Sequence, residues 1–163
     1  MQQALLIIDV QPSFTPMAHR RHPHIDWPPP PAPPPSNATT NPNPPSRNNS
    51  AGTRHPAPDD DSLIQADRIF IKHGYAPSPQ TIEYLQSLKV ERVLVCGLQT
   101  ETCCLAAGFA LFDARLQPTL ITDLTVGSSL DRTGGLGVRL WEHHFKHTVT
   151  LVELHQGLSG MQP

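Results

Sequence analysis

Residues 93–104 read VLVCGLQTETCC, an apolar run that breaks at a glycine and continues into a pair of cysteines. A continuously apolar run, as opposed to an alternating one, is typical of a parallel strand that is covered on both faces. The small and apolar residues that follow Cys104 predict a helix that can lie close against a sheet. A strand, a tight turn and a helix in this order predict an α/β fold.

Similar runs along the chain supply further strands. They lie at residues 4–9 (ALLIID), 69–72 (IFIK), 118–123 (PTLITD) and 148–152 (TVTLV). Helical patterns separate the later runs, one after an N-cap and first-turn proline at Ser78-Pro79, one after Cys103 and one after Asp131. Strands that alternate with helices predict a doubly wound, Rossmann-like parallel sheet with helices on both faces.

Composition excludes several classes of function. The formal net charge is −2 and no basic block is present, so we expect no nucleic-acid partner. No apolar run approaches the roughly 18–20 residues of a membrane span, and the N-terminal residues lack the features of a signal peptide. The three cysteines, Cys96, Cys103 and Cys104, have no disulfide-framework spacing, which predicts a reduced, cytoplasmic setting.

Three reactive side chains follow predicted strands. Asp9 ends the first run, Lys72 ends the second, and Cys103 follows the third at the start of a helix. In open α/β sheets, ligands bind beyond the carboxyl ends of the strands. A thiol at a helix N-terminus beside a cation ionises more readily, and a nearby carboxylate can transfer its proton. Taken singly, each residue has an ordinary alternative as a turn residue, a solvated lysine or a core thiol.

The same segments resemble the isochorismatase-like cysteine hydrolases, which include nicotinamidase-related amidases. The resemblance lies in LLIIDVQPSF (5–14), FIKHGYAPS (70–78) and VCGLQTETCCLAAGFALFDA (95–114). It implies a catalytic Asp9, Lys72 and Cys103, with the family register favouring Cys103 over Cys104. It also implies a cis peptide bond between Leu98 and Gln99, and an oxyanion hole formed by the N–H groups of Gln99 and Cys103.

Other positions follow from the resemblance or lie next to its motifs. Phe14 matches the family's aromatic residue after the first strand and is a candidate for the substrate pocket. His73 and Tyr75 follow Lys72 and either line that pocket or belong to a solvated loop. Glu101 stands where most relatives carry Asp or Asn, which keeps the acid and lengthens it.

A proline-rich segment interrupts the resemblance. Thirteen of the 19 prolines lie between Pro23 and Pro58, and so few aliphatic residues accompany them that folding could not offset the loss of entropy. The family has a long helix and a second parallel strand here, so the sheet is expected to lack one helix and one strand. We divide the chain into the first strand and active-site loop (1–18), a disordered insert or out-of-frame segment (19–60) and the rest of the hydrolase domain (61–158).

The resemblance implies a hydrolase that cleaves the C–N bond of a small amide through a Cys103 thioester, with activity impaired if the 19–60 segment disturbs the site. The alternative is a catalytically impaired module that serves as an oligomerisation or interaction protein. A homo-oligomer is expected in either case, and no cofactor. Some nicotinamidases hold zinc through an acid and two histidines, but the spacing of His22, His24 and Asp26 does not match, so no metal site is predicted.

Overall fold

The computed structural model describes residues 2–11 and 62–159. It divides the chain into two compact units, one of residues 1–8 with 75–163 and one of residues 9–74. The strands of the first unit are β1 (Gln3–Ile8), β2 (Arg92–Leu98), β3 (Gln117–Val126) and β4 (Thr148–Val149). Its helices are α1 (Pro79–Ser87), the π-helical turn η1 (Thr100–Cys104), α2 (Leu105–Asp113), α3 (Gly135–His144) and α4 (Leu151–Ser159).

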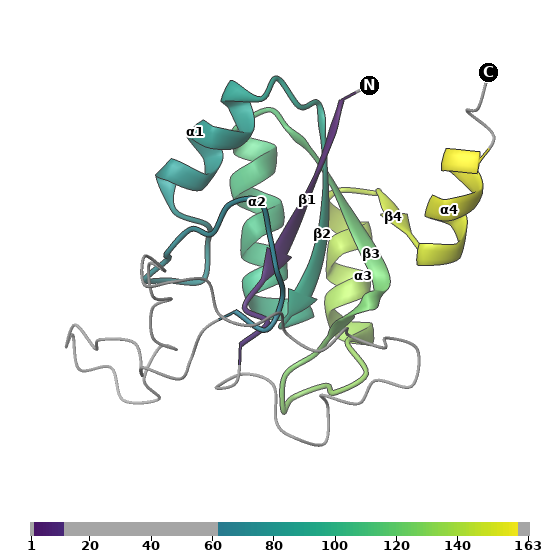
Figure 1. Cartoon of the computed structure of the whole chain (residues 1–163). Helices are drawn as coiled ribbons and strands as arrows, with labels where there is room; N and C mark the ends of the chain where they lie inside the picture. The colour runs from purple at the N-terminus through teal and green to yellow at the C-terminus, as the bar shows by residue number, and fades with distance from the viewer. Residues whose placement is uncertain (1, 12–61, 160–163) are drawn as a thin grey trace. The chain divides into compact units, whose positions relative to one another are not determined.

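The four strands form one parallel sheet in the order β1-β2-β3-β4 (Figure 1). The register pairs β1 with β2 from Gln3 opposite Arg92 to Ile8 opposite Gly97. Strands β2 and β3 pair with a register shift between Val95 and Gly97, where β2 approaches its end. The parallel α/β sheet predicted from the apolar runs is confirmed. β1 stands at one end of the strand order, and no further strand pairs with it among the described residues.

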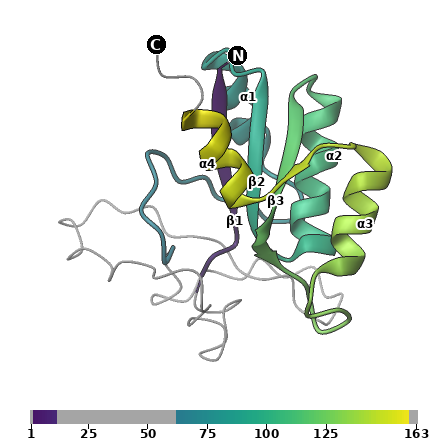
Figure 2. The same cartoon turned by 90° about the vertical axis from the view of Figure 1, so that its right-hand side faces the viewer.

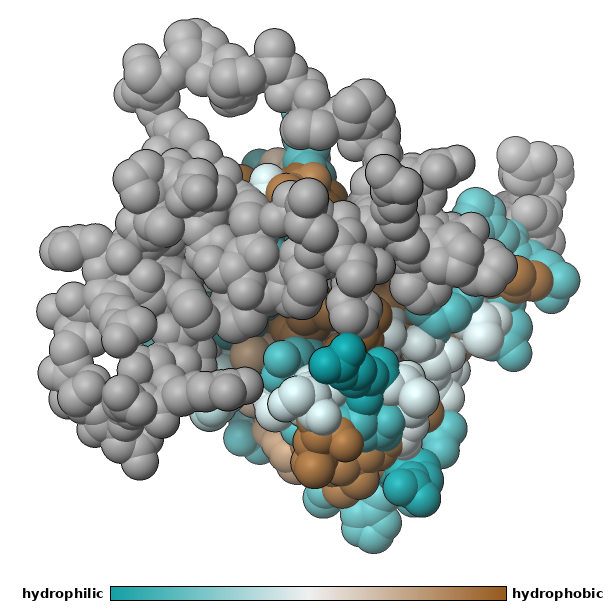
Figure 3. Space-filling view, turned by 90° about the horizontal axis from the view of Figure 1, so that it is seen from below, coloured by the Kyte–Doolittle hydropathy of each residue, from teal (hydrophilic) through white to brown (hydrophobic). Residues whose placement is uncertain are grey.

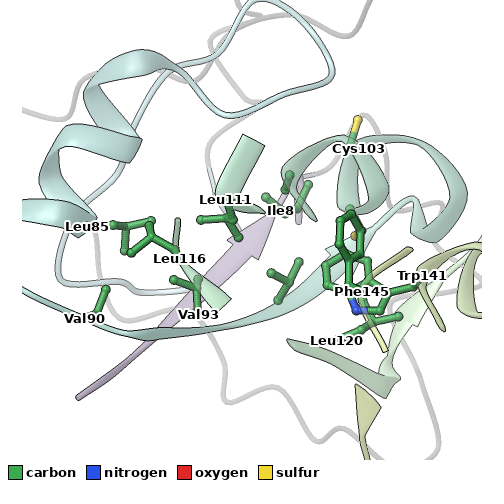
Figure 4. Packing of buried hydrophobic residues seen from close by; sticks show 13 residues of the cluster. Ile8, Leu85, Val90, Val93, Cys103, Leu111, Leu116, Leu120, Trp141 and Phe145 are labelled. Carbon is green, nitrogen blue, oxygen red and sulfur yellow. The ribbon is translucent and has the colours of Figure 1, made fainter. Parts of the chain in front are cut away.

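Helices cover both faces of the sheet. Figure 2 shows α2 and α3 on one side and α4 on the other. The larger cluster of buried side chains joins β1, β2 and β3 to α1, α2 and α3, and includes Val93, Leu111 and Trp141 (Figure 4). The smaller cluster, around Cys96 and Ile121, packs against Leu154 of α4. Val93 and Val95 of β2 belong to the larger cluster, whereas Leu94 and Cys96 belong to the smaller one. Both faces of β2 are therefore buried, which explains why its sequence is continuously apolar.

The helix starts follow local capping rules. The Ser78 side chain accepts the Thr81 N–H at 3.3 Å and Pro79 opens α1, as the sequence predicts. Gly134, not Asp131, is the N-cap of α3, yet Asp131 Oδ2 accepts the Leu136 N–H in the first turn at 2.6 Å. Hydrogen bonds from Thr133 and Leu136 lower the pKa of this carboxyl. Asp131 therefore caps the first turn of α3 although it lies three residues before the N-cap residue.

One predicted strand is wrong, and another is shorter than predicted. Residues 69–72, in the second unit, form no strand, because three apolar residues before a lysine are too few to distinguish a strand from an extended loop. The run at 148–152 ends as a strand at Val149. Thr150 and Glu153 then form a capping box, in which the Glu153 carboxylate accepts the Thr150 N–H at 2.7 Å and Thr150 Oγ1 accepts the Glu153 N–H at 3.2 Å. The box starts α4 at Leu151.

None of the helices in residues 2–11 and 62–159 has both the length and the apolar character needed to cross a membrane.

Candidate active site

The second unit contains an ion pair between two of the predicted catalytic residues. Lys72 Nζ lies 2.8 Å from Asp9 Oδ2, and the same ammonium donates to the Gly74 carbonyl at 2.9 Å. Asp9 follows directly on Ile8, the last residue of β1, and has a φ of +51°, a left-handed conformation that aspartate tolerates better than most residues. The Leu63 N–H donates to the Val10 carbonyl at 2.9 Å and ties the next residue down.

The first unit contains the turn that carries Cys103. Strand β2 ends at Leu98, and the peptide bond between Leu98 and Gln99 is cis, where the family resemblance places such a bond. The Gln99 carbonyl then accepts the N–H groups of Thr102 and Cys104, both at 3.1 Å. These bonds wind the chain into η1, which continues into α2. The sequence predicts a helix here, but its wider π-helical first turn was not foreseen.

The three thiols occupy different surroundings. Cys104, the residue before α2, is completely buried in the larger core cluster, and Cys96 of β2 is buried in the smaller one. Cys103 is also buried, but in the view of Figure 4 its sulfur points away from the labelled core side chains. Burial raises the pKa of the Cys96 thiol to about 12, so Cys96 stays protonated and unreactive at neutral pH. The three thiols thus differ in burial and in the direction of the side chain, although Cys103 and Cys104 belong to the same core cluster.

The raised pKa of Cys96 predicts an alkaline loss of stability. The pKa of the thiol is about 9.0 in the unfolded chain and about 12 in the folded protein, so the unfolded state binds fewer protons between these limits. The free energy of unfolding should therefore fall between about pH 9 and 12, by up to about 1.4 kcal/mol per pH unit from this group. Urea titrations of the wild type and Cys96→Val measure the difference. Identical alkaline slopes in the two proteins would contradict the buried thiol.

The loop after β3 is joined to this turn through the side chain of Glu101, a contact that the sequence does not predict. Glu101 Oε1 accepts the Ser128 N–H at 2.8 Å, across 27 residues of chain. Helix α3 approaches the same turn at Gly137, where an added Cβ would lie 2.6 Å from the Glu101 nitrogen. No local pattern signals such a contact, because one partner is a backbone group in a loop.

Of the remaining predicted residues, His73 and Tyr75 lie within the described part of the chain. Phe14 lies outside the described residues, as do His22, His24 and Asp26. His73 is exposed in the second unit, and Tyr75 is 54% exposed in the first. Among the residues that the structure describes, no three His, Cys, Asp or Glu side chains gather as a metal site requires.

Comparison with known proteins shows which family the chain belongs to. The profile of the isochorismatase domain matches residues 24–151. The chain belongs to the isochorismatase domain family. The matched range begins after Asp9 and includes Lys72 and Cys103. No curated protein matches the chain.

Solved structures support the same fold for this isochorismatase domain. An isochorismatase-like hydrolase from Alkaliphilus metalliredigens superposes with a TM-score of 0.53 at 16% identity, over 65% of this chain and 61% of that one. An isochorismatase family protein from Desulfovibrio vulgaris superposes with a TM-score of 0.52 at 13% identity, over 64% of this chain and 58% of that one. The chain thus spans about three fifths of these structures.

Proposed function

We propose that this isochorismatase-family chain is a cysteine hydrolase that cleaves the C–N bond of a small amide through a thioester on Cys103. The observation that carries the proposal is the 2.8 Å ion pair between Asp9 and Lys72, since it joins two residues that lie 63 positions apart and are both expected in such a site. Chain connectivity adds support. Asp9 is bonded to Ile8, whose partner in the sheet is Gly97, two residues before Gln99.

The proposed reaction divides into two halves. Asp9 accepts the thiol proton of Cys103, and the thiolate attacks the amide carbon to give a tetrahedral oxyanion. The N–H groups of Gln99 and Cys103 stabilise the oxyanion, while the Lys72 ammonium favours the thiolate. Asp9 returns the proton to the leaving amine as the C–N bond breaks. Asp9 then takes a proton from water, which attacks the thioester, and the carboxylic acid leaves as the thiol is restored.

A substrate panel tests the proposal. Nicotinamide, carbamoyl compounds and ureido compounds represent the small amides, and release of ammonia or amine is the measurement. We expect at least one class to be hydrolysed by the wild type and not by Cys103→Ala. The proposal fails if every compound gives the same rate with both proteins.

Replacement of Lys72 by alanine tests the electrostatic part of the proposal. Removing the cation should raise the pH midpoint of Cys103 alkylation by about one unit, because the thiolate loses a neighbouring positive charge. Iodoacetamide labelling from pH 5 to 10, quantified at Cys103 by mass spectrometry, gives the midpoint. Lys89→Ala removes an exposed lysine and is the matched control. An unmoved midpoint in Lys72→Ala would place Lys72 away from the thiol.

A second candidate function is that of an oligomerisation module. It is favoured by helix α2, which has no charged residue between Leu105 and Phe112 and leaves Phe109 40% and Phe112 59% exposed. Hydrophobic surface also reaches the outside on the face seen in Figure 3. We propose a homo-oligomer in a reducing, cytoplasmic setting, since all three cysteines are thiols. Light scattering that gives the mass of one chain at all concentrations would exclude the oligomer.

A further inference from the structure

Glu101 joins the turn that carries Cys103 to the loop after β3. Its backbone belongs to η1, two residues before Cys103, and its side chain reaches the loop after β3. The 2.8 Å bond from the Ser128 N–H to Glu101 Oε1 joins η1 to this loop through a side chain. A hydrogen bond to a carboxylate is stronger than a bond between neutral groups.

The backbone around Glu101 is packed too closely to move far. A Cβ added at Gly137 would lie 2.6 Å from the Thr100 carbonyl carbon and 2.6 Å from the Glu101 nitrogen. A Cβ added at Gly134, where φ is +75°, would lie 2.8 Å from Thr100 Oγ1. The first turn of α3 therefore touches η1 at two glycines. The loop that bonds to Glu101 lies beside these glycines, since a Cβ added at Gly127 would lie 2.9 Å from the Gly134 nitrogen. The Glu101 side chain therefore adds a polar tie to a turn that is already closely packed.

The second carboxylate oxygen of Glu101 reduces the stability of the folded state, because it is buried without a hydrogen-bond partner among the described residues. Glu101 Oε2 and Thr100 Oγ1 are both buried and have no hydrogen-bond partner among the described residues. Burying a polar atom without a partner is unfavourable, and an apolar side chain would avoid that penalty. The bond from the Ser128 N–H to Glu101 Oε1 offsets part of this penalty.

We infer that Glu101 is a positioning residue, whose carboxylate ties the loop at Ser128 to the nucleophile turn and thereby sets the position of Cys103. The inference rests on the proposed role of Cys103 as the nucleophile. Glu101 touches no reacting atom in this account. It acts through the geometry of η1, from which the Cys103 side chain and N–H group both project.

Two measurements that need no turnover test the inference. The first is hydrogen exchange of the Ser128 amide, which should accelerate about tenfold or more in Glu101→Ala, equivalent to about 1.4 kcal/mol. The second is the pH midpoint of Cys103 alkylation, which should rise by about half a unit or more because the displaced thiol loses the favourable field of the helix N-terminus. Loss of the carboxylate charge by itself would lower this midpoint, so the direction of the shift separates the two effects. A merely structural loss changes access to the thiol and hence the plateau rate, whereas a misplaced thiolate changes the midpoint.

Three further variants sharpen the test. Glu101→Gln retains an oxygen acceptor for the Ser128 N–H and should recover most of the protection and most of the midpoint. Ser128→Ala keeps the backbone donor, and Glu142→Ala removes an exposed carboxylate on α3, so both should stay near the wild type.

The inference is overturned if Glu101→Ala leaves either measurement unchanged, or if Glu142→Ala moves both as far. It is also overturned if Ser128→Ala matches the loss in Glu101→Ala, or if Glu101→Gln recovers nothing. A substrate panel without turnover would reject the proposed hydrolase and leave these readouts interpretable.

Discussion

Replacement of Cys103 by alanine should reduce amide hydrolysis to the uncatalysed background, a loss of at least about 10⁴-fold in kcat. The reason is chemical: without the thiol no thioester can form, and water has no equivalent route through the same groups. Cys104→Ala should retain at least about a tenth of the activity. Cys104 is fully buried in the core cluster, so its loss opens a small cavity and costs about 1 kcal/mol of stability.

The comparison between the two adjacent cysteines is the decisive part of this experiment. Both variants remove one sulfur from consecutive residues of the same turn, so damage to the fold should affect them similarly. Initial rates with a substrate found in the panel, measured beside urea midpoints, separate lost chemistry from lost stability. Equal loss of activity in the two variants would reject Cys103 as the nucleophile. Cys96→Val, from the opposite face of the sheet, completes the set.

The parts of the fold that could be predicted are those coded by local pattern. Continuous apolar runs predicted β1, β2 and β3. The reason holds best for β2, because a strand buried on both faces needs apolar residues at nearly every position. β1 is apolar too but only partly covered, with Leu5 52% exposed. The Ser78-Pro79 pair marked the start of α1 through capping chemistry. The same reasoning fails at residues 69–72, where the pattern is too short, and at residues 150–152, where a helix cap follows the apolar run. The Thr150–Glu153 box was readable from the sequence and should have ended the last strand early.

Some residues of the candidate site could likewise be predicted from the sequence, and others could not. Asp9 and Lys72 were expected together at strand ends, and the 2.8 Å ion pair joins them, although Lys72 does not end a strand. Family resemblance, more than sheet geometry, identified that pair. The Glu101 contact with Ser128 could not be predicted, because it joins a side chain to a loop amide 27 residues away and leaves no periodic trace.

Replacement of Gly97 by alanine should have the largest effect on stability, with a loss of at least about 3 kcal/mol or a failure to fold. Gly97 has a φ of +112°, a conformation that residues with a Cβ rarely adopt. The added methyl carbon would lie 2.7 Å from the Ile8 nitrogen and 2.9 Å from its carbonyl carbon, and closer still to the carbonyl oxygen. These are backbone atoms, which cannot turn aside as a side chain would.

The consequence reaches the site because β1 and β2 must separate where they pair at Ile8 and Gly97. Asp9 follows that pair in sequence, so a displaced β1 would carry the proposed proton-transfer group with it. Gly157→Ala is the matched control, since an added Cβ there meets nothing within 4 Å and replaces a helical glycine in α4. It should leave stability unchanged or raise it by up to about 1 kcal/mol. Urea unfolding of both variants gives the comparison, and a Gly97→Ala protein within about 0.5 kcal/mol of the wild type would show that β1 and β2 do not pair in this register.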